Sequence, residues 1–146
     1  MVAEIKRITQ EEGFSWFHQI EFISCFVGTL QYHDDFETTG CHEYPRYPIE
    51  TLVDSGGDCE DKAILLASLL NLAGYDANLL LSSNHCAVGV LGSEDMSGDY
   101  YLDKGRRYYF IEATTPAGCG IKSDEFKKGF RAFDIVEKDE NPSPSE

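Results

Sequence analysis

Three short segments of this 146-residue chain carry side chains that together could activate a thiol. Residues 56–61 read Gly-Gly-Asp-Cys-Glu-Asp, which predicts that Cys59 lies in the first turn of a helix. His85 begins a later strand-like segment, and Glu112 lies in the strand-like segment after that. A nucleophile, a base that takes its proton and an acid that orients the base are the three parts of such a site.

The expected position of Cys59 favours a nucleophilic thiol, but its neighbours oppose one. The start of a helix carries partial positive charge and free N–H groups, and both stabilise a thiolate. The Cys59 N–H would also point to where an oxyanion develops. The carboxylates of Asp58, Glu60 and Asp61 disfavour a second negative charge beside them. A nearby cation is therefore required, and the imidazolium of His85 is the expected one.

The helix that would position Cys59 is the clearest element of the sequence. Residues 59–73 are predicted to be helical, with Asp58 as the N-cap, Asp61 completing a capping box and Gly74 ending the helix. Apolar residues cover nearly all sides of this helix, which predicts that it runs through the core. Beyond it the apolar period changes to two, which predicts strands at residues 77–82, 85–91 and 108–114, the last two joined by a long loop.

The rest of the chain shows weaker patterns. Apolar spacing predicts one helix over residues 11–30, and Gly, Pro and charged residues predict a loop over 31–49. Three phenylalanines near the C-terminus indicate a last short helix or strand. We expect one α+β domain over residues 1–139, with a central buried helix packed on an antiparallel β-sheet, and a disordered tail or linker over 140–146.

Composition excludes several classes of protein. Asp and Glu number 26 against 12 Lys and Arg, and the net charge is −14, so we expect neither a nucleic-acid partner nor an anionic membrane surface. The sequence contains no apolar run long enough to cross a membrane and no signal peptide at its start, which predicts a cytoplasmic protein. Five cysteines without a Cys-x-x-Cys pair predict mostly free thiols.

Four segments, in this order and spacing, resemble the transglutaminase-like superfamily, and more narrowly its prokaryotic transglutaminase-like cysteine peptidase branch. The similarity extends over residues 26–115, and the segment around Cys59 is the most specific. The segments are Tyr-Pro-Ile-Glu-Thr-Leu at 47–52, Gly-Gly-Asp-Cys-Glu-Asp-Lys-Ala at 56–63, His-Cys-Ala-Val-Gly-Val at 85–90 and Ile-Glu-Ala-Thr at 111–114. The resemblance implies a papain-like fold.

It also implies roles for the site residues. Cys59 would be the nucleophile, His85 the base and Glu112 the orienting acid, where the family usually has Asp. Gln31 is the candidate for the side chain that binds the oxyanion. The family forms a thioester with a peptide or protein amide and needs no cofactor. We expect hydrolysis, as in a peptidase or amidase, ahead of crosslinking to an amine.

Two alternatives stay open at this level. A catalytically inactive member would bind a peptide or protein partner through the same groove. A structural zinc site would use Cys41, His42, His85 and Cys86. Neighbouring residues on a strand point to opposite faces, which makes each of these pairs a poor source of two ligands for one metal.

Overall fold

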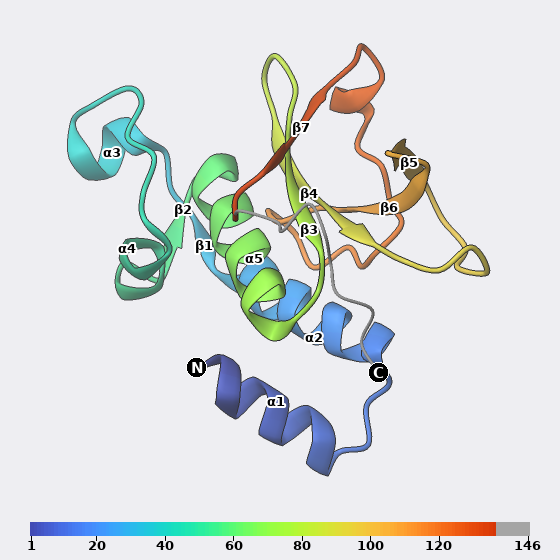
Figure 1. Ribbon diagram of the computed structural model, residues 1–146. Helices are drawn as coiled ribbons and strands as arrows, with labels where there is room; N and C mark the ends of the chain where they lie inside the picture. Colours follow the sequence, from blue (N-terminus) through green and yellow to red (C-terminus); the bar gives the residue numbers. More distant parts are fainter. Residues whose placement is uncertain (137–146) are drawn as a thin grey trace.

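A computed structural model describes residues 1–136, which form an α+β fold with helices on one side of an antiparallel sheet (Figure 1). The helices are α1 (Val2–Glu11), α2 (Trp16–Thr29), α3 (Asp35–Thr39), α4 (Pro48–Val53), α5 (Cys59–Ala73) and the 3₁₀ turn η1 (Asp124–Phe126). The strands are β1 (Gln31–Tyr32), β2 (Gly56–Gly57), β3 (Ala77–Leu81), β4 (Cys86–Leu91), β5 (Tyr100–Asp103), β6 (Arg106–Ile111) and β7 (Arg131–Asp134).

Helix α5 begins and ends where its sequence signals place it. The Asp58 carboxylate accepts hydrogen bonds from the backbone N–H groups of Glu60 and Asp61, and the Asp61 carboxylate accepts one from the Asp58 N–H. At the other end Gly74 adopts a left-handed conformation, with φ of 98°, which favours glycine. The predicted bounds of this helix, 59–73, are confirmed.

The main sheet contains five strands in the order β5-β6-β4-β3-β7, and every adjacent pair is antiparallel. Strand β4 lies at its centre and is almost completely buried. It pairs with β3 through Leu79↔Val88 and with β6 through Val88↔Ile111. A separate parallel pair joins β1 to β2, immediately before α5.

The core lies between α5 and the sheet. Helix α5 is packed against α2 on one side and against β3 and β4 on the other (Figure 1). The fully buried side chains include Ile20, Ile23, Val27, Leu65, Leu66, Leu70, Val88, Val90 and Ile111. This explains why α5 is apolar on nearly all sides. No helix within residues 1–136 has the length and apolar composition needed to cross a membrane.

The opposite face of the sheet is covered by aromatic rings from the C-terminal part of the described chain. Phe126 of η1 packs against Phe110 of β6 and against Phe130, with ring centroids 5.9 Å and 5.7 Å apart. Leu80 and Ala87 complete this second cluster. The η1 turn is therefore held on the sheet by apolar burial.

Four sequence predictions need correction or completion. The single helix over 11–30 is wrong: the chain breaks at Gly13, which has φ of +68°, and α2 starts after the N-cap Ser15, while α1 precedes the break. The loop predicted at 31–49 contains β1 and α3, and the long loop after β4 contains β5. The phenylalanine-rich segment forms both a 3₁₀ turn and a strand. The tail at 140–146 lies outside the described residues.

Candidate active site

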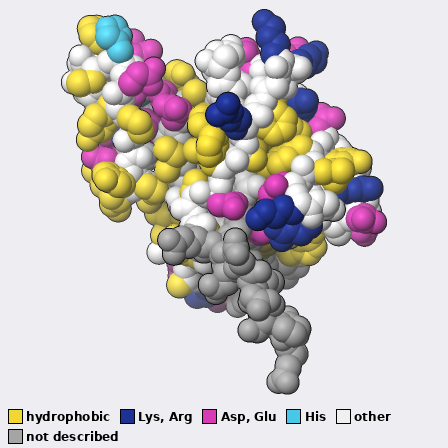
Figure 2. Space-filling model, turned by 45° about the horizontal axis from the view of Figure 1, so that its top comes forward, with side chains coloured by type: hydrophobic (Ala, Val, Ile, Leu, Met, Phe, Trp, Pro, Cys, Tyr) yellow, Lys and Arg dark blue, Asp and Glu magenta, His cyan; other side chains and the backbone are white. Residues whose placement is uncertain are grey.

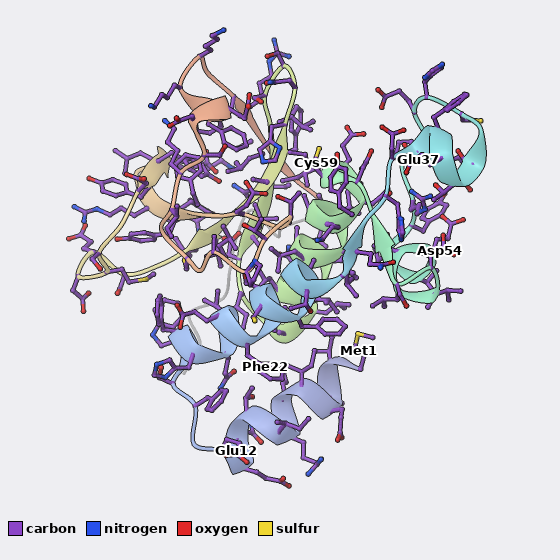
Figure 3. All side chains as sticks on the ribbon, turned by 180° about the vertical axis from the view of Figure 1, so that it is seen from behind. Met1, Glu12, Phe22, Glu37, Asp54 and Cys59 are labelled. Carbon is purple, nitrogen blue, oxygen red and sulfur yellow. The ribbon has the colours of Figure 1, made fainter. Side chains whose placement is uncertain are left out.

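Cys59 is the first residue of α5 and is partly accessible to solvent. Figure 3 shows it at the end of α5 that lies between the β3–β4 hairpin and the segment carrying α3 and α4. The first N–H groups of a helix have no acceptor within the helix, so the Cys59 N–H is available to a bound group. The thiol and this N–H therefore occupy one helix end.

The two glycines before Cys59 allow close approach of other chain segments. A Cβ atom on Gly57 would lie 2.5 Å from the Cβ of Asp61, and one on Gly56 would lie 2.5 Å from the backbone oxygen of Gln31. Any larger residue would therefore push β1 or the first turn of α5 away. The glycine pair sets the position of the nucleophile.

His85 lies directly before β4, at the end of the turn that joins β3 to β4. Its backbone N–H donates to the Ser82 hydroxyl, and its carbonyl accepts from the Ser82 N–H, at 3.1 Å and 2.9 Å. Phe126 packs against the imidazole with ring centroids 5.5 Å apart. The His85 side chain is 14% exposed, so the ring is held in place by the turn and by packing.

Glu112 follows β6 and contacts the imidazole directly. Its Oε2 lies 2.7 Å from Nε2 of His85, and its side chain is 12% exposed. The other oxygen, Oε1, accepts from the Thr114 N–H at 3.1 Å and from the Thr114 hydroxyl at 2.8 Å. Because Glu112 occupies Nε2, the Nδ1 atom of His85 is left for Cys59.

The electrostatics of these groups favour a charged pair. The hydrogen bond with Cys59, followed by the one with Glu112, raises the pKa of His85 to about 10 although burial opposes the charge. Burial also raises the pKa of the Glu112 carboxyl, but the hydrogen bonds from His85 and Thr114 outweigh it and the net shift is downward. At neutral pH His85 is therefore an imidazolium beside a carboxylate.

Cys59 and His85 line one pocket of about 190 Å³. Glu43, Asp58 and Glu60 line it too, and burial raises the pKa of the Glu60 carboxyl, with further increases from its acidic neighbours. Figure 2 shows a hollow between the part of the molecule that carries α3 and α4 and the part formed by the sheet, with acidic side chains beside it. The thiol is thus reachable from solvent through an acidic opening.

Gln31 does not lie in this pocket. It pairs with Gly56 on β1, while the next residue, Tyr32, pairs with Gly57. Paired residues of parallel strands point to the same side, and the Gly57 side faces Asp61 at the start of α5. Tyr32 therefore lies on the side of the helix start, and Gln31 on the opposite one.

Tyr32 is a neighbour of the start of α5 that sequence reasoning missed, and it lies outside the residues that line the pocket. Burial raises the pKa of its hydroxyl, and the charges of Cys59 and Asp58 raise it further. The tyrosine stays 59% exposed, so its hydroxyl is accessible to a bound substrate. Nothing in the sequence indicated this residue, because β1 has only two residues and lies in a segment predicted to be a loop.

The residues of the zinc alternative are not gathered into one group. Cys41 is exposed in the loop after α3, and His42 stacks on Phe36 with ring centroids 4.8 Å apart. Within residues 1–136, carboxylate oxygens of Asp35, Asp58 and Asp61 lie within 4.8 Å of one another, and Arg46 is paired with Asp35 and Asp61 there. Neither cysteine of the zinc hypothesis belongs to this carboxylate cluster.

All five cysteines are free thiols, as the sequence predicts. Cys86 is buried, and burial raises the pKa of its thiol far above the ordinary range. Burial, with a contribution from Glu21, raises the pKa of Cys119 to about 12. Cys25 and Cys41 are exposed but lie away from His85. Within the described residues, Cys59 is the one of the five that begins a helix, and it lines its pocket together with His85 and Cys86.

Comparison with known proteins finds similarity in the fold but not in the sequence. No protein-family model matches the sequence, and neither does any curated protein. Solved structures of LapG from Legionella pneumophila do match. One LapG structure has a TM-score of 0.54 at 17% identity and covers 80% of this chain and 75% of LapG. EGTA-treated LapG has a TM-score of 0.59 at 16% identity, with coverage of 92% and 82%. Calcium-bound LapG has a TM-score of 0.56 at 16% identity, with coverage of 92% and 84%.

At this level of identity the likeness is one of architecture, and the architecture is the one expected from the sequence: a helix that starts at a cysteine, packed on an antiparallel sheet that carries a histidine. The chain therefore shares the papain-like α+β fold of these structures.

Proposed function

We propose that this chain is a cysteine-dependent acyltransferase that cleaves amides of peptides or proteins through a thioester. The observation that carries the proposal is the position of His85, whose Nε2 lies 2.7 Å from Glu112 while Cys59 is its other hydrogen-bonding neighbour. A thiol, an imidazole and a carboxylate in that order are the parts of a nucleophilic triad.

In the proposed mechanism the proton of Cys59 already resides on Nδ1 of His85, as an imidazolium beside a thiolate, and the thiolate attacks the carbonyl carbon of the amide. A C–S bond forms and the carbonyl oxygen becomes an oxyanion, which the Cys59 N–H stabilises. The C–N bond then breaks, and His85 gives its proton to the departing amine. The acyl group remains on Cys59 as a thioester.

Water completes the cycle. His85 removes a proton from the water, the resulting hydroxide attacks the thioester carbon, and the acid leaves as the thiol is restored. We place hydrolysis ahead of transfer to an amine because water needs no second binding site. Tyr32, on the side of β1 that faces the start of α5, is our candidate for a second oxyanion donor in place of Gln31.

The test is direct capture of the acyl-enzyme. The chain is incubated with a panel of activated peptide esters and analysed by intact-protein mass spectrometry after acid quenching. We expect one acyl group on the parent protein and none on Cys59→Ala, with Cys25→Ala, an exposed thiol, as the matched control. A peptide that is retained without any covalent adduct would instead favour the inactive binding domain. A primary amine added to the reaction shows whether transfer competes with hydrolysis.

A further inference from the structure

A buried guanidinium is bonded to Asp61, two residues after the proposed nucleophile, and takes no part in the mechanism above. The Arg46 side chain is 2% exposed. Its Nη1 lies 2.7 Å from Asp35 and 2.5 Å from Asp61, and its Nε lies 3.3 Å from Asp54. The Nη2 atom donates to the hydroxyl of Thr38.

This guanidinium connects four segments of the chain. Asp35 belongs to α3, Asp54 follows α4, Asp61 belongs to the first turn of α5, and Arg46 itself lies in the loop between α3 and α4. The backbone N–H of Arg46 also donates to Asp61, at 2.7 Å. The same loop brings Glu43 to the wall of the Cys59 pocket.

The bond to Asp61 leads directly to Cys59. Asp61 is the third residue of α5, and its Oδ2 accepts from both Arg46 and the N–H of Asp58. That second bond closes the capping box that fixes where the helix, and with it Cys59, begins. A displaced Asp61 would therefore displace the nucleophile.

The charge of Arg46 matters as well as its bonds. The titratable and charged groups around the thiol come from every neighbouring element, and most are acidic. They are Asp58, Glu60, Asp61 and Lys62 of α5 and its cap, Asp35 of α3, Glu43 of the α3–α4 loop, Tyr32 of β1, His85 and Cys86 at β4, and Glu112 after β6. Arg46 is bonded to two acidic members of this set, Asp35 and Asp61, whereas His85 is bonded to Glu112.

We infer that Arg46 is a positioning residue for the nucleophile: it holds Asp61, and through it the start of α5, and it offsets the carboxylates that disfavour a thiolate at Cys59. The inference rests on the proposed function of Cys59. Arg46 touches no reacting atom. Its guanidinium lies between Asp35 and Asp61, the two buried carboxylates of the cluster, and supplies the positive charge that balances them.

The experiment measures the pH midpoint of Cys59 alkylation by iodoacetamide in folded protein. We expect Arg46→Gln to raise the midpoint by about one pH unit or more, because the cation that balances Asp35 and Asp61 is lost and their charges then oppose a thiolate. Asp35→Asn should lower it, because one carboxylate is removed and the cation stays. The double variant should lie between the two. Arg46→Lys should keep the midpoint near that of the parent but lose turnover, because a lysine lacks the fork that holds two carboxylates.

Arg106→Gln is the matched control, since that arginine pairs with Asp76 at 3.2 Å, and it should leave the midpoint unchanged. A folded Arg46→Gln protein with the parent midpoint would overturn the inference. If that variant does not fold, Asp35→Asn decides: an unchanged or raised midpoint also overturns it. Failure of the proposed function reads differently, because it would appear as the absence of an acyl-enzyme in the parent protein, whatever the Arg46 variants do.

Discussion

The Nε2 atom of His85 and the Oε2 atom of Glu112 lie 2.7 Å apart, and both side chains are nearly buried. The pair joins the two central strands of the sheet, because His85 precedes β4 and Glu112 follows β6. The Thr114 N–H and hydroxyl both donate to Oε1 of Glu112, which fixes the orientation of its carboxylate. Glu has one methylene group more than the Asp that is usual in the resembled family, and in this arrangement its carboxylate still reaches His85.

Removal of the Glu112 charge should lower the pKa of His85. Glu112→Gln keeps the shape of the side chain but removes the carboxylate that stabilises the imidazolium. We expect the His85 titration to move down from about 10 and the rate of acylation to fall about 10²-fold or more. NMR titration of the histidine rings measures the shift, with the other three histidines as internal references. An unchanged His85 titration would show that Glu112 does not stabilise the imidazolium.

The same pair should make stability depend on pH in a defined direction. The folded-state pKa of His85 is raised from 6.5 to about 10, so its contribution is complete below pH 6.5 and is lost as the pH rises toward 10. We expect the difference in unfolding free energy between the parent and His85→Gln to shrink across this interval. Urea unfolding at several pH values measures it. A difference that is constant from pH 6.5 to 10 would contradict the raised pKa.

Lys62 should be important for stability although it is a charge in the core. Its ammonium donates to the carbonyls of Gly28, Leu30 and Thr114, at 3.2, 2.9 and 3.2 Å, and so joins α2 to the segment after Glu112. Lys62→Met leaves three buried carbonyls without this donor, and we expect a loss of about 2 kcal/mol or more. Urea unfolding measures it. The exposed Lys127→Met is the control, and equal stabilities of the two variants would refute the role.

Gly28 should tolerate no side chain. A Cβ atom there would lie 2.8 Å from the backbone of Thr115 and Pro116, which follow the Glu112 segment. We expect Gly28→Ala to cost about 1–3 kcal/mol, because backbone must move to accept the methyl group. Thermal or urea unfolding measures this, with Cys25→Ala on the same helix as the control. Wild-type stability in Gly28→Ala would show that the two segments are farther apart.

Local signals explain what the sequence could predict. Helix α5 was predictable because Asp58, Asp61 and Gly74 act within one turn of its ends, and the strands after it because their apolar period is two. The sequence also predicted that His85 and Glu112 would meet, and in the structure they do so from positions directly outside two neighbouring strands, His85 before β4 and Glu112 after β6. Local patterns decide these elements.

Contacts between distant segments explain what it could not. The two residues of β1 become a strand only because they pair with Gly56 and Gly57. The sequence alone therefore could not predict that the side chains of Gln31 and Tyr32 point to opposite sides of this strand. Arg46 shows no local pattern, and its importance comes from carboxylates that are 8 to 15 residues away in the sequence. Helix α1 was missed because its buried residues are few.

The central claim is that Cys59 and His85 form a reactive pair, and the pH dependence of alkylation tests it most directly. Native protein is treated with iodoacetamide from acid to alkaline pH, and each cysteine is followed by peptide mapping. We predict that Cys59 reacts well below pH 7 and loses this property in His85→Gln, that the exposed Cys25 and Cys41 require a higher pH than Cys59, and that buried Cys86 reacts last. A Cys59 that reacts only in the same pH range as the exposed thiols would contradict the account.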